Sequence, residues 1–368
     1  MRDATLVTTQ SQLEVAVFRL QSAARLAIDT EFMRERTYYP QLCLVQAATD
    51  SDCFLVDPLA GLDLEGFYAL LADRSKLKIL HAARQDLEVL QLGNRPVPAP
   101  VFDTQVAAAM LGFPPQAGYA ELVSRQLGHS IDKGQTRTDW SRRPLTPEQL
   151  AYAADDVHHL LTLHMELAAA LAAKGRDAWL AEDAAALEEP SLYKTEPGDA
   201  WRRLKGLGRT KPREQAVARA LAEWRERRAI EADKPRGWIL SDELIYTLAT
   251  GAPRTTADLE AVRALPPAVA RKRGDELLAL IAAAADSAGA SGIEAAGRRP
   301  TPAENALVAK LQKVVRDEAA ALDLSPEVLG TRRDVEALVF PERGEPAVLR
   351  GWRRAVIGEK LLAARQEK

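Results

Sequence analysis

The 368-residue chain contains only two cysteines, Cys43 and Cys53, and no long hydrophobic run. Both cysteines lie in strand-like segments. We therefore expect buried free thiols rather than a disulfide or a metal site, which fits a reducing cytoplasm. No apolar stretch reaches the roughly 18 residues that a membrane-spanning helix needs, and the first residues show no signal-peptide core. We expect a cytoplasmic protein of two or three domains that does not contact a membrane.

Several enzyme motifs are also absent. The chain has no glycine-rich phosphate-binding loop and no Gly-x-Ser-x-Gly nucleophile motif. His158, His159 and His164 are close together, but their spacing differs from that of a zinc-binding helix, so we expect them to be solvated or hydrogen-bonded.

The formal net charge of -3 is divided unevenly along the chain. Residues 1–190 hold 17 Lys/Arg and 26 Asp/Glu, a net charge of -9, and residues 191–368 hold 32 and 26, a net charge of +6. This division favours metal or catalytic chemistry in the first part and polyanion contacts in the second. Charge asymmetry that serves only solubility is the alternative.

Two carboxylates follow a short apolar segment near the N-terminus. Residues 26–28 read as a buried strand with a partner near Val45, and the strand ends in Asp29-Thr-Glu31. Alternate side chains of a strand point to the same face, so Asp29 and Glu31 should project side by side. Such a pair repels and is costly to bury unless a divalent cation lies between the two acids. Two solvated acids at a strand end are the alternative.

Strands and helices alternate through the rest of the acidic part, which predicts a mixed α/β sheet. The predicted strands are 38–46, 53–57, 77–80 and 101–104, and the predicted helices are 64–71, 81–90 and 105–111. Asp86 falls in the first turns of one helix. Thr146 begins a longer helix, capped by Thr146 and Gln149, which we expect to continue to about Lys174.

That long helix carries Tyr152 and Asp156 on one face, one turn apart. With Asp29, Glu31 and Asp86, Asp156 completes a set of hard oxygen ligands that suits Mg²⁺ or Mn²⁺. Two such ions can activate a water and stabilise the leaving oxygen in phosphoryl transfer. The Tyr152 hydroxyl could hold the attacking water in line.

The first ~185 residues resemble ribonuclease D, in the tyrosine-containing branch of the DEDD exonuclease superfamily. The matching segments are Ile28-Asp-Thr-Glu-Phe32, Tyr39-Pro-Gln-Leu-Cys-Leu-Val-Gln46, His81-Ala-Ala-Arg-Gln-Asp-Leu-Glu88, Phe102-Asp-Thr-Gln105, Asp132-Lys-Gly-Gln-Thr-Arg-Thr-Asp-Trp140 and Tyr152-Ala-Ala-Asp-Asp156. The resemblance implies a ribonuclease-H-like 3′–5′ exonuclease domain that removes nucleotides from RNA 3′ ends.

The resemblance also implies roles for the five residues. Asp29, Glu31 and Asp156 would bind a first ion, and Asp29 would bridge to a second ion that Asp86 supports. Tyr152 matches the residue that orients the water. Asp155 departs from the family, where a small apolar residue is usual. Its helix angle should point it away from the site.

The second part of the chain resembles two small all-helical helicase-and-RNase-D C-terminal (HRDC) domains. We expect domains at 1–187, 198–287 and 300–368, separated by linkers at 188–200 and 286–302. The second HRDC-like domain is divergent. It depends on a faint repeat in which Leu240–Leu244 resembles Leu324–Val328 and Asp258–Glu260 resembles Asp334–Glu336.

A basic run begins the first of these domains, and it would contact phosphates without reading sequence. It consists of Arg202, Arg203, Lys205, Arg209, Lys211 and Arg213. A solvated helix end is the alternative.

The function predicted from all these features is trimming of the 3′ ends of tRNA precursors and other structured RNAs, with release of 5′-mononucleotides and no obligatory protein partner. A 3′–5′ DNA exonuclease and an inactive RNA-binding scaffold are the alternatives.

Overall fold

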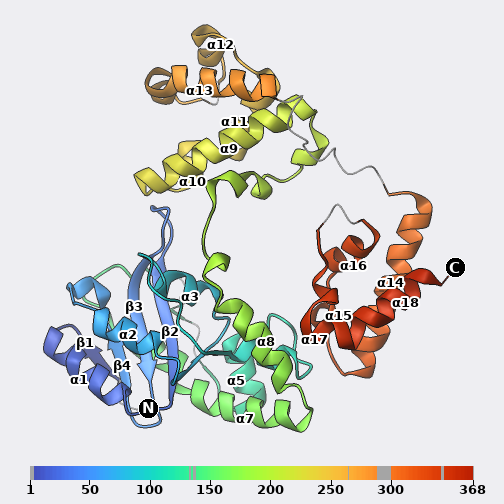
Figure 1. Cartoon of the computed structure of the whole chain (residues 1–368). Coiled ribbons are helices and arrows are strands. Elements are labelled where there is room, and N and C mark those ends of the chain that lie inside the picture. Colours follow the sequence, from blue (N-terminus) through green and yellow to red (C-terminus); the bar gives the residue numbers. More distant parts are fainter. Residues whose placement is uncertain are drawn as a thin grey trace. The chain divides into compact units, whose positions relative to one another are not determined.

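The computed structural model describes residues 4–131, 134–135, 138–263, 265–287, 300–340 and 344–367. The chain forms two compact units (Figure 1). The first unit contains Met1–Met33, Gln41–Tyr193 and Pro300–Lys368, and the second contains Arg34–Pro40 and Lys194–Arg299.

A six-stranded mixed sheet with the order β1-β4-β3-β2-β5-β6 forms the centre of the first unit. Its strands are β1 (Thr5–Val7), β2 (Arg25–Met33), β3 (Gln41–Ala48), β4 (Cys53–Val56), β5 (Leu77–Leu80) and β6 (Val101–Asp103). β2, β3 and β4 form an antiparallel meander, while β1, β5 and β6 pair in parallel with their neighbours. The predicted mixed sheet is confirmed.

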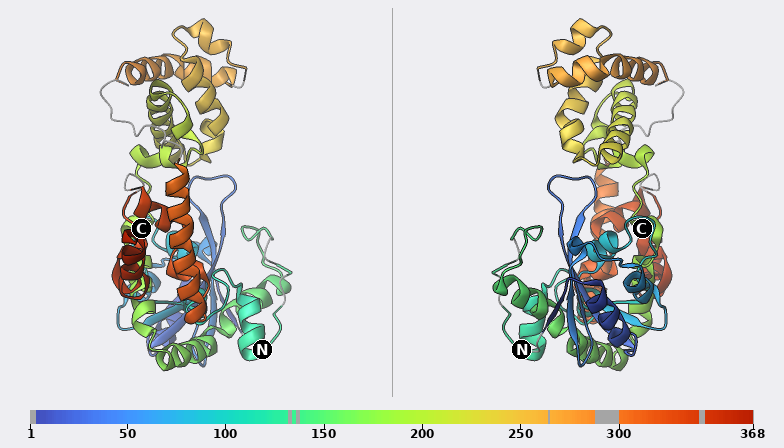
Figure 2. Two further views of the ribbon diagram at one scale, coloured as in Figure 1. Left: turned by 90° about the vertical axis from the view of Figure 1, so that its right-hand side faces the viewer. Right: turned by 90° about the vertical axis from the view of Figure 1, so that its left-hand side faces the viewer.

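Helices cover both faces of this sheet (Figure 2). The first face packs against α1 (Gln10–Leu20), α2 (Glu65–Ala72) and α3 (Arg84–Leu90). The second packs against α4 (Thr104–Ala109), α5 (Tyr119–Leu127), α6 (Pro147–His158), α7 (Leu160–Ala173) and α8 (Asp177–Leu187). Ile28 points to the first face and Ala27 to the second. Alternation along β2 therefore places Asp29 and Glu31 on the second face, which α6 covers.

The C-terminal segment also belongs to the first unit. Its helices are α14 (Pro302–Ala321), α15 (Pro326–Leu329), α16 (Arg332–Val339), α17 (Gly351–Arg353) and α18 (Glu359–Gln366). The segment shares an apolar core with the sheet domain, and Trp352 of α17 stacks on Trp179 of α8 with ring centroids 4.3 Å apart. Arg353 forms a two-pronged ion pair with Asp183 at 2.6 and 2.9 Å.

The second unit is a bundle of five helices together with the loop that joins β2 to β3. The helices are α9 (Pro212–Ala232), α10 (Arg236–Ile239), α11 (Asp242–Gly251), α12 (Thr256–Glu260) and α13 (Pro267–Ser287). Glu226 is fully buried in α9 and accepts hydrogen bonds from the Tyr38 hydroxyl at 2.5 Å and from Arg236 at 3.1 Å. Asp233 accepts the backbone amides of Tyr38 and Tyr39.

The repeat is present in the order of the helices, but in a different register from the one predicted. A long helix, a four-residue helix and a short helix follow one another both as α9–α10–α11 and as α14–α15–α16. In each copy a left-handed aspartate, Asp233 or Asp323, follows the long helix, and a hydroxyl residue, Ser241 or Thr331, caps the short one. Leu240–Leu244 therefore does not correspond to Leu324–Val328, and the predicted pairing was wrong. The domain boundaries at 1–187, 198–287 and 300–368 stay predictions.

Three other predictions about elements need correction. β2 contains both acids as predicted, but it does not end at Glu31 and continues to Met33. β3 begins at Gln41 rather than Tyr38, because residues up to Pro40 belong to the second unit and proline has no amide to donate. The helix from Thr146 does not continue unbroken to Lys174, because α6 ends at His158 and α7 begins at Leu160.

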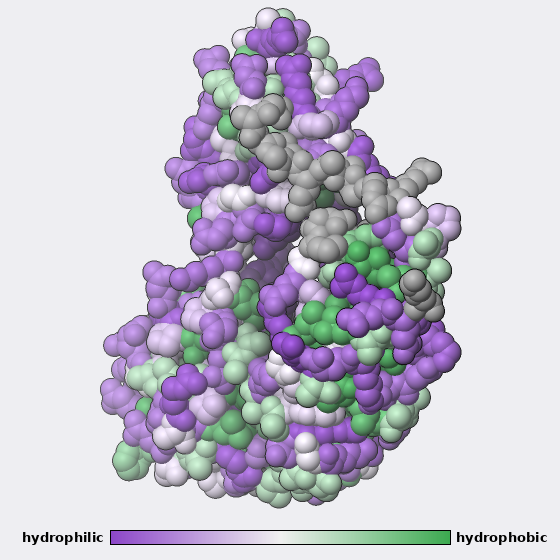
Figure 3. All heavy atoms as spheres, turned by 45° about the vertical axis from the view of Figure 1, so that its right-hand side comes forward, coloured by the Kyte–Doolittle hydropathy of each residue, from purple (hydrophilic) through white to green (hydrophobic). Residues whose placement is uncertain are grey.

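The state of the two cysteines agrees with the expectation. Cys43 and Cys53 are buried free thiols. Hydrophilic side chains predominate on the face shown in Figure 3, with apolar ones in smaller groups. Within the described ranges, no helix has the length and apolar character needed to cross a bilayer. Most of the predicted linker 286–302, residues 288–299, lies outside the described residues.

Candidate active site

The site forms where β2 extends beyond its neighbour β5. β2 pairs with β3 as far as Met33, with Asp29 opposite Gln46, but it pairs with β5 only through Ala27. β5 ends at Leu80, and the chain turns there into α3. The two acids of β2 therefore lie just past the carboxyl end of a parallel strand, the usual place for a ligand in an α/β sheet. The register shifts between Glu31 and Phe32, and the pairing resumes with Phe32 opposite Leu42.

Three carboxylates from two elements meet at this place. Asp29 and Glu31 of β2 and Asp156 of α6 each offer an oxygen within 4.8 Å of the others, and they are the only such group among the described residues. Asp86 lies outside this group, in the first turn of α3. Its carboxylate accepts a hydrogen bond from the Thr30 hydroxyl at 2.5 Å.

Asp103 fixes the start of α3, and through it the position of Asp86. The carboxylate of Asp103 accepts the backbone amides of Ala82 at 3.0 Å and Ala83 at 2.9 Å, and it also caps α4 through Gln105 at 2.8 Å. Ala82 has a left-handed φ of 54°, which turns the chain sharply from β5 into α3. One aspartate thus holds two helix starts together at the ends of β5 and β6.

Burial and mutual repulsion raise the pKa of every acid in the site. Burial, reinforced by Asp86, Asp156 and Glu31, raises the pKa of Asp29 well above its ordinary value. Burial and the nearby charges raise the pKa of Glu31 to about 9. Burial also raises the pKa of Asp86 and of Asp156 to about 7, opposed by hydrogen bonds from Thr30 and Tyr152 respectively.

These features fit a divalent metal site. Carboxylate oxygens are the ligands that hard cations prefer, and positive charge would offset the burial and the repulsion that raise the four pKa values. Gln46 gives a second indication. It faces Asp29 across the strand pair, is fully buried, and has both amide atoms without a hydrogen-bond partner. Buried amides normally find partners, so an additional polar group is expected beside Asp29.

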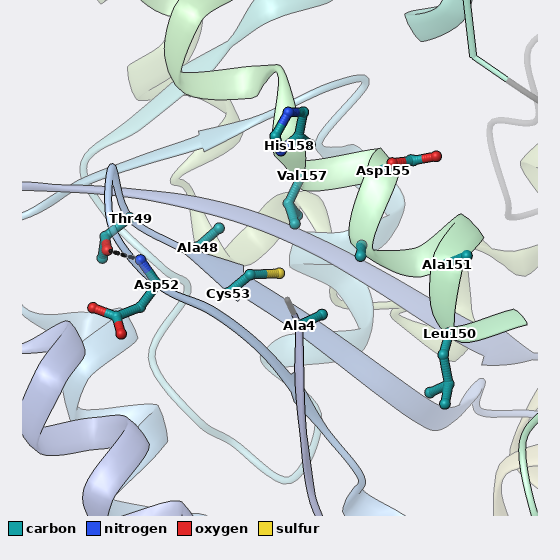
Figure 4. A pocket seen from close by; sticks show the side chains of 11 residues that line it. Ala4, Ala48, Thr49, Asp52, Cys53, Leu150, Ala151, Asp155, Val157 and His158 are labelled. Atoms are coloured by element: carbon teal, nitrogen blue, oxygen red, sulfur yellow. Dashed lines mark hydrogen bonds between the residues drawn. The ribbon is translucent and has the colours of Figure 1, made fainter. Parts of the chain in front are cut away.

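Asp155 lies apart from the acid cluster despite being the neighbour of Asp156. It lines a separate cavity of about 190 Å³ with His158, Thr49 and Cys53, between α6 and the β3–β4 turn (Figure 4). None of the four site acids lines this cavity. This position is consistent with the expectation that Asp155 points away from the site.

The remaining predicted residues lie outside the acid cluster. His164 contacts Arg25 and packs edge-on against Phe102, and His159 stacks on His129.

All six cations of the basic run are exposed, in the second unit. Arg202, Arg203 and Lys211 form ion pairs with Asp199, Glu226 and Glu214 at 2.9, 3.5 and 3.9 Å. Lys205, Arg209 and Arg213 form no ion pair within the described part of the chain.

Four residues at or near this site could not be recognised from sequence spacing. Thr30, Gln46 and Asp103 carry no distinctive spacing, although a strand-end aspartate before Thr-Gln is typical of a helix cap. Tyr119, whose hydroxyl contacts the junction of α6 and α7, follows Gly118 at a helix start and resembles an ordinary core aromatic. Part of the segment Asp132–Trp140 that carried the resemblance, residues 132, 133, 136 and 137, lies outside the described residues.

Comparison with known proteins supports the same site. A 3′-5′ exonuclease family model matches residues 4–172, and an HRDC domain model matches residues 214–281. Ribonuclease D of Gluconacetobacter diazotrophicus is 40% identical over 98% of this chain and 92% of its own. That of Acidiphilium cryptum is 39% identical over 97% of this chain and 92% of its own.

Solved structures agree with the sequence relatives. The crystal structure of Escherichia coli RNase D, described as an exoribonuclease involved in structured RNA processing, matches with a TM-score of 0.87 and 30% identity over 99% of both chains. The catalytic core of RRP6 from Trypanosoma brucei matches with a TM-score of 0.59 and 25% identity, covering 77% of this chain and 80% of its own. With the acid cluster, the mixed sheet and relatives that extend over nearly its full length, the chain belongs to the ribonuclease D family of 3′–5′ exoribonucleases.

Proposed function

We propose that this chain trims the 3′ ends of tRNA precursors and other structured RNAs and releases 5′-mononucleotides one at a time. The observation that carries the proposal is the meeting of Asp29, Glu31 and Asp156 within 4.8 Å, with Tyr152 one turn before Asp156. The name and description of the E. coli relative support a structured RNA as substrate.

Each residue of the site has a proposed part in the reaction. Asp29, Glu31 and Asp156 would hold one divalent ion, and Asp29 with Asp86 would hold a second. Mg²⁺ or Mn²⁺ at these positions would activate water and stabilise the leaving 3′ oxygen. The Tyr152 hydroxyl orients the attacking water toward the last phosphate. The P–O3′ bond breaks, the RNA keeps a free 3′-hydroxyl, and the departing nucleotide keeps its 5′-phosphate.

The proposal is tested on a labelled RNA with a free 3′ end, with DNA of the same sequence in parallel. Stepwise, metal-dependent release of 5′-mononucleotides from RNA is expected. Asp29→Asn should lower the rate at least ~100-fold, because it removes a charge shared by both ions. Asp155→Asn is the matched control, since that carboxylate lines a different cavity, and it should keep activity.

Each alternative has its own result in this assay. Faster cleavage of DNA than of RNA would favour a DNA exonuclease, and no release from either would favour a binding scaffold. Internal cleavage of a circular RNA would contradict an enzyme that needs a 3′ terminus. Near wild-type activity of Asp29→Asn would remove Asp29 from its bridging role.

Tyr152→Phe separates water orientation from metal binding. Removing the hydroxyl should lower kcat by ~10²–10⁴, the scale of one positioned catalytic group, while the Mn²⁺ concentration needed for half-maximal activity changes little. A large increase in that concentration would assign Tyr152 to metal binding instead.

The cellular setting is part of the proposal. Buried free thiols at Cys43 and Cys53 fit a reducing compartment, so we assign the protein to the cytoplasm. RNA is the partner proposed for the exposed basic run, and no obligatory protein partner is proposed.

A further inference from the structure

The junction of α6 and α7 is broken without a residue that breaks helices. α6 ends at His158 and α7 begins at Leu160, so only His159 separates them. The sequence from Asp155 to Leu160 contains neither proline nor glycine. Sharp breaks in helices otherwise arise where a side chain or a water enters the backbone hydrogen-bond ladder.

Tyr119 supplies such a side chain. Its hydroxyl donates to the Asp155 carbonyl at 3.2 Å and accepts the His159 amide at 3.2 Å, an amide that also donates to the Val157 carbonyl. The Asp155 carbonyl and the His159 amide, four residues apart, are the pair that would bond directly in an unbroken α-helix. The hydroxyl therefore takes the place of one backbone hydrogen bond. The His159 carbonyl then starts α7 by accepting the Leu163 amide at 2.9 Å.

This insertion is adjacent to the metal site. Asp156 follows Asp155 directly, and Tyr152 lies one turn earlier on the same helix. If Asp155 and His159 bonded directly, the last turn of α6 would tighten and the direction of the Asp156 side chain would change. The position of Tyr119 is fixed in turn, because it begins α5 and its ring packs against His81 with centroids 5.6 Å apart.

We propose that Tyr119 is a positioning residue whose hydroxyl holds the α6–α7 break open and thereby aims Asp156 and Tyr152 at the reaction centre. The inference rests on the proposed roles of those two residues. Tyr119 itself touches neither substrate nor metal in this scheme; it acts through the backbone of α6.

The test is Tyr119→Phe, which removes only the hydroxyl. On a short single-stranded RNA, kcat should fall by roughly 10- to 100-fold, the effect expected from a displacement of about 1 Å, while KM stays within about twofold. In the metal-free protein, exchange of the His159 amide with solvent should become slower, because the direct bond to Asp155 forms. The second measurement needs neither metal nor substrate.

Tyr193→Phe is the matched control. Its hydroxyl also donates to a backbone carbonyl, that of Leu187, at 2.6 Å, but at the end of α8. Tyr193→Phe should leave kcat and exchange of the His159 amide unchanged.

The proposal is overturned if Tyr119→Phe keeps kcat within about threefold of wild type, or if exchange of the His159 amide is unchanged or faster. A Tyr119→Phe protein that did not fold would also overturn it, since the hydroxyl would then serve the core. If Asp29→Asn is inactive while Tyr119→Phe is normal, the proposed function stands and only this inference fails.

Discussion

Glu31 shows how strongly the site depends on positive charge. Its pKa rises from an ordinary 4.5 to about 9 because burial and the neighbouring carboxylates disfavour its ionised form. Between pH 4.5 and about pH 9, Glu31 is therefore protonated in the folded protein but ionised in the unfolded chain. The contribution of Glu31 to the stability of the metal-free protein is therefore fully present below about pH 4.5 and is lost as the pH rises to about 9. Asp86 and Asp156, with pKa values of about 7, add to the loss in the lower part of that range.

Saturating Mn²⁺ should remove this loss. The increase in Tm on adding Mn²⁺ is expected to be about 5 °C larger near pH 8.5 than near pH 5.5. Thermal denaturation at both pH values with and without the ion measures it. Glu31→Gln should raise the metal-free Tm at the higher pH and reduce the Mn²⁺ effect. A metal-free Tm that rises with pH would contradict the assignment.

At the level of single residues, short-range spacing was enough to find the acids. Alternation along a strand paired Asp29 with Glu31, and the helical period paired Tyr152 with Asp156. The supporting residues could not be found in this way, because their roles come from contacts far along the chain. The Thr30 hydroxyl meets Asp86, the Asp103 carboxylate meets the turn at Ala82, and Tyr119 meets α6. The spacing of residues within one helix or strand contains no information about such long-range contacts.

At the scale of elements, the predicted strands and helices mostly exist and the errors lie at their ends. β2 was expected to end with its two acids, but it continues to Met33 because Phe32 and Met33 still pair with β3. The helix from Thr146 kept its apolar period and its cap, so nothing local indicated the break at His159. In both places a distant part of the chain overrides the local pattern.

The attachment of α17 to α8 gives a prediction at this scale. Asp183 of α8 accepts two hydrogen bonds from Arg353 and one from the Trp352 indole at 3.1 Å. Asp183→Asn removes the charge and one acceptor, leaving a half-buried guanidinium without its ion pair. Hydrogen bonds to charged groups contribute about 1.5–3 kcal/mol, so Tm should fall by about 5 °C.

Asp177→Asn provides the comparison for that variant. It makes the same substitution on the same helix, but Asp177 is exposed and forms no ion pair within the described ranges. Its Tm should change by less than about 2 °C. Equal losses in the two variants would mean that Asp183 acts only through the charge of α8 and does not hold α17.

At the scale of the whole molecule, the first unit is assembled from the two ends of the chain. Residues 300–368 share the apolar core of the sheet domain, and the basic run lies in the unit inserted between them. Deleting residues 200–368 would therefore damage the first unit as well as remove the basic run. Substitution of chosen surface cations is the better way to ask whether the basic run binds RNA.

Lys205, Arg209 and Arg213, the cations of the basic run that form no ion pair in the described part of the chain, are the ones to replace. The variant changes Lys205, Arg209 and Arg213 to Gln together. Each phosphate contact that is lost should lower the log–log salt slope of binding by about 0.7–0.9, so a loss of roughly 2–3 is expected for a tRNA-like substrate, with weaker binding. Cleavage of a short single-stranded RNA should keep its kcat and KM, because its contacts lie near the acids. Binding at several salt concentrations and steady-state cleavage measure the two quantities.

A second triple variant separates phosphate contact from net charge. It replaces Arg202, Lys211 and Arg227, which are exposed cations of the same unit that pair with Asp199, Glu214 and Glu223 at 2.9, 3.9 and 2.6 Å. Their charge is already partly neutralised, so the salt slope should change by less than in the first variant. Equal changes would show that only the total charge of the unit matters.

The first variant has its own contradicting outcome. If it slowed cleavage of the short RNA as much as cleavage of the tRNA-like RNA, the basic run would serve the active site or the fold. Its proposed role in holding structured RNA would then be wrong.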